Sequence, residues 1–295
     1  MPHDMANPSA ILAVADGTAA DAGLLAKAMR LALLCGAKLE LFICDAEQAY
    51  QLKHAYEARS VDVARKASLE HSRTYLRTLT NTAPGAEVPV TTDVACESPL
   101  YEGIVRKIRS SHADLVLKSA GGVDRPHRRT FDANDWQLMR NSPATLVLSR
   151  GRAWGKAPRF LAALDVSEEE TAGLAQAILE RAQSLATACG GQLEVAYAEA
   201  SGSDSNTRQK RLAALQQLAE RAHLDARQQH FLIGDPQVTL QKLIREQDYD
   251  VIVIGALTHR PSTAPLVGTL TASLVDALDS DFVLVRRSPA ARDTR

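Results

Sequence analysis

The chain repeats one pattern of residues in its two halves, and this repeat constrains the fold more than any other feature. Segments 11–46 and 160–200 each contain an apolar run that ends in an aspartate, a long stretch of helical periodicity, a Cys-Gly pair and a second apolar run. Segments 98–120 and 235–257 also match each other. The period of about 140 residues is too long for a solenoid, whose repeats span roughly 20–50 residues. The sequence therefore predicts a duplicated domain.

Strand and helix patterns alternate within each copy. In the second copy, short β-branched runs predict five strands, at 159–164, 193–198, 229–233, 251–255 and 282–286. Helices are predicted up to about residue 188, then over 206–223, 236–247 and 270–279. A Ser167–Glu170 capping box is expected to open the first of these helices. The first copy follows the same pattern with a longer second helix, at about 47–80.

Apolar strands that do not alternate with polar residues are typical of a parallel sheet buried on both faces. We therefore predict an α/β fold of two tandem, doubly wound domains, each with a five-stranded parallel sheet, over residues 8–150 and 158–288. The linker between them is short, so we expect the domains to pack on each other about a pseudo-two-fold axis. The segments 144–149 and 282–286 would then face each other.

Composition and charge exclude several classes of protein. With 45% hydrophobic and 23% charged residues the chain is typical of a folded protein, and its formal charge of −1 gives no general attraction to nucleic acid or anionic lipid. No apolar run reaches the roughly 18–20 residues that a membrane span requires, and four cysteines without CxxC spacing are expected to be reduced. We therefore expect a cytoplasmic protein with no membrane partner and no specific nucleic-acid partner.

The loop after the predicted strand 251–255 is a candidate phosphate site. In open parallel sheets, ligands bind at the carboxyl ends of the strands. This loop begins with Gly255 and ends with Gly268-Thr269 at a predicted helix start, where backbone N–H groups and the Thr269 hydroxyl would bind an anion. From these residues alone a second interpretation stays open, because glycines often end strands and begin helices without binding any ligand.

The spacing of this loop resembles the G-x2-G-x9-G-[S/T] signature of the universal stress protein family, with nine residues between Thr258 and Gly268. The aspartate after the first strand, the CGAKLEL and DYDVIVIGA segments and the FDANDWQLMRNSPATLVL segment are also similar to this family, above all to its tandem-domain members. The resemblance covers nearly the entire chain. It implies an adenine nucleotide alpha hydrolase-like fold, a regulatory role in the stress response, and ATP or a related adenine nucleotide as the ligand.

The resemblance also implies which residues of the second copy contact the nucleotide. Asp165 would meet the adenine or ribose, and Ala198 would lie against the base. The ribose and α-phosphate would contact Ile254 and Gly255, and the distal phosphates would contact Gly268, Thr269 and Leu270. Thr258 stands where the signature has its second glycine. If that position requires a positive φ, a β-branched residue is strained there, and His259 and Arg260 would supply compensating positive charge.

The first copy departs further from the signature. Ser119 replaces the first glycine, and Asp132-Ala133 replaces the Gly-Thr pair. An aspartate at that helix start occupies the place of a phosphate and repels one. The basic loop 124–129 would either bind an acidic group or be an exposed charged loop. We therefore expect the nucleotide loop of the first copy to be degenerate, in a half that is either structural or binds a different ligand.

Motifs for other chemistry are absent from the sequence. The eight histidines lack H-x3-H and H-E-x-x-H spacing, and there is no G-x-S-x-G elbow and no G-x-x-x-x-G-K-[ST] loop. We predict no catalytic residue, and no metal beyond a Mg²⁺ ion carried by the nucleotide.

Three classes of function remain. The first is a regulatory nucleotide-binding protein without strong turnover, in which one chain forms an intramolecular pseudo-dimer and further dimerisation is left open. The second is a weak ATPase, for which Asp165 is the single obvious general base. The third is an interaction or ligand-binding module that has lost its nucleotide.

Overall fold

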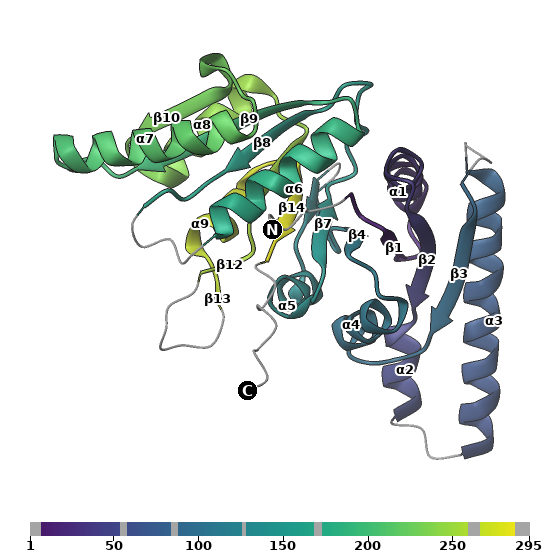
Figure 1. The fold of residues 1–295 in the computed structure, drawn as a ribbon. Helices are drawn as coiled ribbons and strands as arrows, with labels where there is room; N and C mark the ends of the chain where they lie inside the picture. The colour runs from purple at the N-terminus through teal and green to yellow at the C-terminus, as the bar shows by residue number, and fades with distance from the viewer. Residues whose placement is uncertain are drawn as a thin grey trace, which may run out of the picture. The chain divides into compact units, whose positions relative to one another are not determined.

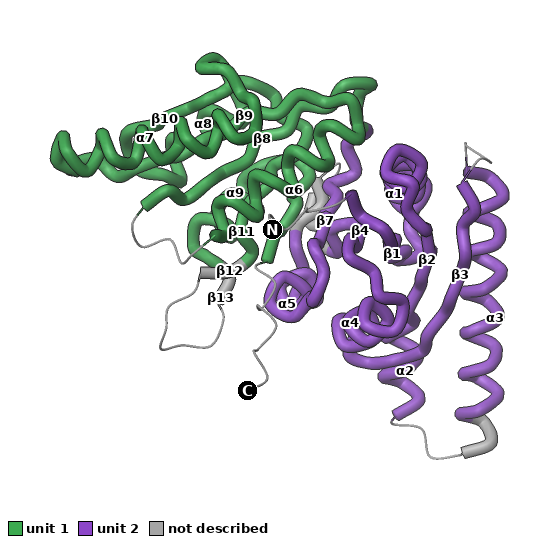
Figure 2. The backbone as a smooth tube through the Cα atoms, viewed as in Figure 1, with its two compact units in different colours: residues 1–6, 154–295 green, residues 7–153 purple. Residues whose placement is uncertain are grey.

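A computed structural model describes residues 7–53, 58–83, 88–125, 128–167, 173–258 and 266–286. These residues form an α/β fold with mostly parallel strands, in agreement with the predicted fold class. The chain divides into two compact units, residues 7–153 and residues 154–295, which are coloured separately in Figure 2.

The unit of residues 7–153 contains one parallel five-stranded sheet with the order β3-β2-β1-β4-β7 (Figure 1). Its strands are β1 (Ala10–Ala15), β2 (Lys38–Cys44), β3 (Val90–Ala95), β4 (Leu115–Ser119) and β7 (Thr145–Ser149). Its helices are α1 (Asp21–Cys35), α2 (Ala46–Lys53), α3 (Ala58–Thr82), α4 (Leu100–Ser111) and α5 (Ala133–Asn141). A short antiparallel pair, β5 (Gly122–Arg125) and β6 (Arg128–Thr130), follows β4.

The unit of residues 154–295 repeats this topology, with the strand order β10-β9-β8-β11-β14. Its strands are β8 (Arg159–Ala163), β9 (Gln192–Glu199), β10 (Gln229–Ile233), β11 (Val251–Gly255) and β14 (Asp281–Val285). Its helices are α6 (Leu174–Ala188), α7 (Ser205–Arg221), η1 (Ala226–Gln228), α8 (Pro236–Gln247) and α9 (Thr269–Ala277). The loop after β11 contains the short antiparallel pair β12 (Leu257–Thr258) and β13 (Leu266–Val267).

Three strands are buried along their whole length. Strands β4, β7 and β14 have no half-buried or exposed residue, as expected where helices cover both faces of a parallel sheet. Removal of such strands from water is the main contribution to the stability of each unit. Among the described residues no helix is both long enough and apolar enough to cross a membrane.

Two helices differ from the sequence prediction. The predicted helix over 47–80 is observed as α2 and α3, with residues 54–57 outside the described part of the chain. The helix expected to open at Ser167 instead begins at Leu174, after Gly173 in a left-handed conformation with φ 96°. Glu170 of the expected capping box lies outside the described residues.

Candidate functional site

The carboxyl ends of β8, β9 and β11 meet at one edge of the second sheet. β8 pairs with both of the other strands, and the backbone N–H of Leu164 donates to the carbonyl of Ala196 at 2.9 Å. Asp165 follows β8, Ala198 lies near the end of β9, and Gly255 ends β11. The fold therefore brings these three predicted site residues to the same edge.

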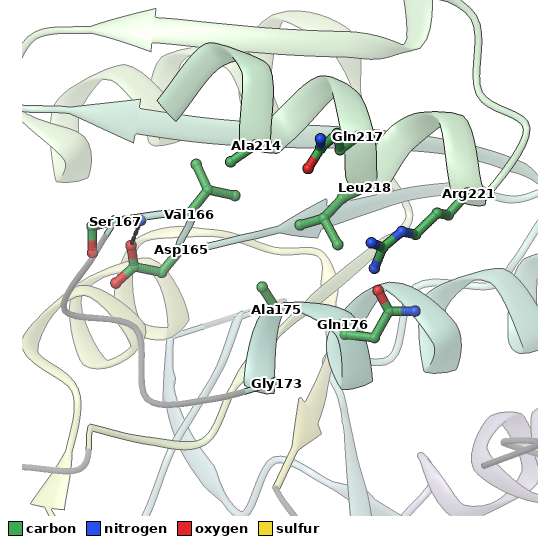
Figure 3. A pocket seen from close by; sticks show the side chains of 10 residues that line it. All are labelled: Asp165, Val166, Ser167, Gly173, Ala175, Gln176, Ala214, Gln217, Leu218 and Arg221. Carbon is green, nitrogen blue, oxygen red and sulfur yellow. Dashed lines mark hydrogen bonds between the residues drawn. The ribbon is translucent and has the colours of Figure 1, made fainter. Parts of the chain in front are cut away.

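Asp165 is exposed and lines a pocket of about 220 Å³ (Figure 3). Its Oδ1 accepts a hydrogen bond of 2.9 Å from the backbone N–H of Ser167, which fixes the turn after β8. Figure 3 shows the carboxylate at one end of the pocket and the guanidinium of Arg221 at the other, with the Gln176 amide near Arg221. The pocket thus offers a carboxylate and several polar groups beside the sheet edge.

The end of β9 carries a buried charge cluster that the sequence analysis did not predict. The Glu199 side chain is 0% exposed and binds Arg208 at 2.6 Å and Arg211 at 3.1 Å. Hydrogen bonds from Arg208 and Arg211 hold the pKa of this carboxyl below its ordinary value. Arg211 also lines a second pocket, of about 270 Å³, that shares Ser167 with the first. A sequence signal exists, since Glu199 ends a strand and both arginines lie on the helix that follows.

The start of α9 lies against the end of β11. The Thr271 hydroxyl donates to the carbonyl of Gly255 at 3.0 Å, so the strand end and the first turn of the helix are tied together. A Cβ atom at Gly255 would lie 2.9 Å from Cδ2 of Leu174, which gives this glycine a packing reason in addition to any role at a ligand. Gly268 is the N-cap of α9, and Thr269 and Leu270 are its first two residues.

The structure gives the backbone conformation of two signature positions in this loop. Thr258 lies in the extended strand β12, paired with Leu266, so the strain expected of a positive φ does not arise there. Gly268 has φ −58° and ψ 141°, a conformation open to any residue, so its backbone does not require glycine. His259 and Arg260 lie outside the described residues.

The corresponding helix start in the first unit is occupied by the chain's own carboxylates. Asp132 is the N-cap of α5, and its Oδ1 accepts from the backbone N–H of Asp135 at 2.8 Å. The Asp135 carboxylate in turn accepts from the N–H groups of Asp132, at 3.2 Å, and Gly121, at 2.7 Å. In this capping box the two aspartates bind each other's backbone N–H groups at the start of α5.

A buried cation completes this arrangement. Lys118 Nζ lies 2.7 Å from Asp135, and the two side chains are 2% and 0% exposed. In the alignment of the copies, Lys118 stands opposite Ile254 and Asp135 stands opposite Thr271. Burial raises the pKa of the Asp135 carboxyl, while the Lys118 ammonium and the Gly121 N–H oppose the rise. The helix start of the first unit therefore contains an internal ion pair.

The loop after β1 is held by hydrogen bonds to a buried carboxylate of the same unit. Asp21, which is 1% exposed, accepts hydrogen bonds from the backbone N–H groups of Asp16 and Gly17 and, at 2.7 Å, from the Tyr75 hydroxyl. Burial raises the pKa of the Asp21 carboxyl. Asp16 itself accepts from the N–H of Thr18 at 3.0 Å, in the same kind of turn as Asp165 makes in the second unit.

Two further observations concern metal ligands and cysteine. No group of three or more His, Cys, Asp or Glu residues there has the geometry to hold a metal ion. Burial raises the pKa of the Cys44 thiol to about 11, so this cysteine is protonated at neutral pH.

Residues 9–150 match the sequence model of the universal stress protein family. These residues, nearly half of the chain, belong to the universal stress protein family. Relatives align with both halves: Universal stress protein E of Salmonella typhi is 21% identical, and the alignment covers 94% of this chain and 93% of the relative. Universal stress protein E of Photorhabdus laumondii is 21% identical, with 96% of each chain covered.

Solved structures of similar fold include a universal stress protein from Archaeoglobus fulgidus DSM 4304, with a TM-score of 0.73 at 12% identity over 94% of this chain and 98% of that one. A protein of unknown function from Pseudomonas aeruginosa PAO1 has a TM-score of 0.73 at 20% identity, over 95% and 93% of the two chains. At these identities the likeness shows the universal stress protein fold alone.

Proposed function

We propose that this stress-response protein binds one adenine nucleotide, ATP or an AMP-like molecule, through its second universal stress protein domain, residues 158–288. The first domain, residues 8–150, binds no nucleotide. Any Mg²⁺ ion would enter with the phosphates. The protein acts as a regulator that senses or stores the nucleotide, without strong turnover.

The contrast between the two equivalent helix starts carries this proposal. In the first unit, Asp132 and Asp135 satisfy the N-terminal N–H groups of α5. In the second unit, the N-cap of α9 is Gly268, and no side-chain cap bond is found there among the described residues. A helix N-terminus without a carboxylate favours a bound anion, because its N–H groups and dipole are positive.

The carboxylates that the described residues bring to this edge favour regulation over hydrolysis. Glu199 is the buried carboxylate nearest in sequence to Ala198, but both of its oxygens are bound by arginines and its pKa is lowered, which makes it a weak base. Asp165 is the other carboxylate that the described residues bring to this edge, and it is exposed. Phosphate release should therefore stay at the level of a variant that does not bind nucleotide.

Titration calorimetry with ATP is expected to give one site per chain. The second domain offers a helix start without a carboxylate, whereas that of the first is filled by Asp132 and Asp135. Two equivalent sites would contradict the proposed loss of function in the first domain. No heat even at millimolar ATP would favour the alternative that the protein binds a different ligand or a protein partner.

Replacement of Asp165 is expected to weaken ATP binding, and replacement of Asp16 is not. Each aspartate accepts a hydrogen bond from the N–H group two residues later. Asp165→Ala and Asp16→Ala therefore remove equivalent hydrogen bonds from equivalent turns. Loss of a carboxylate that binds the ribose or adenine costs about 1.5–3 kcal/mol, or roughly 10- to 150-fold in Kd. Equal effects of the two variants on the calorimetric Kd would show that Asp165 stabilises the turn and does not bind the nucleotide.

A further inference from the structure

A large cavity in the first unit lies apart from the helix start that Asp132 fills. It has a volume of about 530 Å³, is open to solvent, and is lined by residues of α2, α3, α4 and the loop 96–99 that follows β3. Figure 1 shows these three helices around the carboxyl ends of β2 and β3. The cavity exceeds both pockets beside Asp165, although the nucleotide loop of its unit is degenerate.

Two cations on the cavity wall are held by backbone carbonyls. Lys53 Nζ donates to the carbonyl of Ser98 at 2.9 Å, and Arg65 Nη2 donates to the carbonyl of Cys96 at 2.9 Å. Both side chains line the cavity, and within the described residues neither forms an ion pair with a carboxylate. Carbonyl bonds fix the position of these charges without neutralising them, and each cation keeps further donors for a ligand.

The carboxylates on the same wall have partners of their own. Glu97 lies 2.8 Å from Arg106, and Glu102 accepts from the Tyr101 hydroxyl at 3.0 Å. With Lys53, Arg65 and Arg106 against Glu97 and Glu102, the lining has an excess of one positive charge. The Tyr101 hydroxyl is neutral and leaves the charge of Glu102 in place, so Lys53 and Arg65 together supply two positive charges against this one carboxylate.

Four apolar residues, Ala49, Leu52, Val61 and Pro99, also line the cavity, together with Cys96, Ser98 and Gly103. We propose that this cavity binds an organic anion, a molecule with one carboxylate, sulfonate or phosphate group at Lys53 and Arg65 and an apolar body against these four residues. Burial of the body and two charge-assisted hydrogen bonds would supply the affinity. The ligand site is independent of the nucleotide site proposed for the second domain.

The test uses anilinonaphthalenesulfonate, a fluorescent anion of this type, and phenylnaphthylamine, which has the same body without the sulfonate. The full-length protein is expected to bind the sulfonate at one site per chain and at least tenfold more tightly than the amine. Lys53→Met and Arg65→Met are each expected to weaken binding of the sulfonate about tenfold and to leave the Kd for ATP unchanged. Because both side chains are exposed or lie at the cavity mouth, circular dichroism should show unaltered folding.

Two further variants serve as controls. Lys66→Met makes the same change of charge on α3 next to Arg65 but outside the cavity lining, and it should bind the sulfonate like the parent. Arg65→Lys keeps the charge and should retain most of the affinity. Equal binding of the two probes would identify a purely apolar pocket and overturn the proposal. Unchanged sulfonate binding in Lys53→Met and Arg65→Met, or no binding by the parent, would overturn it as well.

Discussion

The Gly268→Asp variant is expected to bind ATP about 30- to 1000-fold more weakly than the parent while staying folded. An aspartate is among the best N-cap residues, and the φ of −58° at Gly268 is open to it. Its carboxylate would meet the distal phosphates at close range, where two like charges about 4 Å apart repel by up to roughly 4 kcal/mol at an effective dielectric constant of about 20. In the first unit, Asp132 is the N-cap of the equivalent helix α5, so an aspartate is accommodated at this position.

The matched control for this variant is Gly268→Asn, which has nearly the same shape and caps a helix but carries no charge. We expect its Kd for ATP to stay within about threefold of the parent, since it lacks the charge repulsion. Calorimetry with ATP and a thermal melt of each variant measure affinity and folding separately. If both variants weaken binding equally, the cause is steric. If Gly268→Asp binds ATP as the parent does, the phosphates do not lie at the start of α9.

The regular elements of the second unit were largely predictable from the sequence. Strands 229–233 and 251–255 and helix 236–247 have the predicted bounds. The strands are apolar, β-branched runs, and the helix has Pro236 at its first position with the Asp235 side chain accepting from the N–H groups of Gln237 and Val238. These signals are local, and the tertiary structure agrees with them.

The loop conformations and the buried ion pair were less accessible. A signature position at which glycine is usual does not reveal the φ angle of the residue there. The conformations of Gly268 and of Thr258, which stands at such a position, therefore required the structure. Lys118 and Asp135 look ordinary one at a time, since strand ends carry lysines and helix starts carry acids. The available signal was the comparison of the two copies. Ile254 and Thr271 of the second copy correspond to the charged residues Lys118 and Asp135 of the first.

The Lys118→Met variant is expected to lose about 3–5 kcal/mol of unfolding free energy, the largest stability effect predicted for this chain. Methionine fills a similar volume, but the Asp135 carboxylate at 0% exposure is left without its cation. Such a loss is a large share of the total stability of a domain, which is about 5–15 kcal/mol. Urea unfolding measures it as a shift of the midpoint. Lys107→Met is the comparison, since Lys107 pairs with Glu40 and with the half-exposed Asp93, and it should cost about 1 kcal/mol or less.

The dependence of this loss on pH identifies its cause. Without Lys118, the pKa of Asp135 in the folded state rises further above its ordinary value of 3.8, because the burial that raises it is no longer opposed by the ammonium. The folded variant then binds a proton more tightly than the unfolded chain. The contribution of protonated Asp135 to the stability of the variant is therefore greatest below about pH 4 and is lost as the pH rises through the folded-state pKa. The difference from the parent should accordingly be smaller at about pH 5 than at about pH 8.

Adding Asp135→Asn to Lys118→Met should recover part of the stability at the higher pH, since no buried charge remains. A loss independent of pH and unaffected by the second substitution would mean that Lys118 contributes through packing of its aliphatic chain.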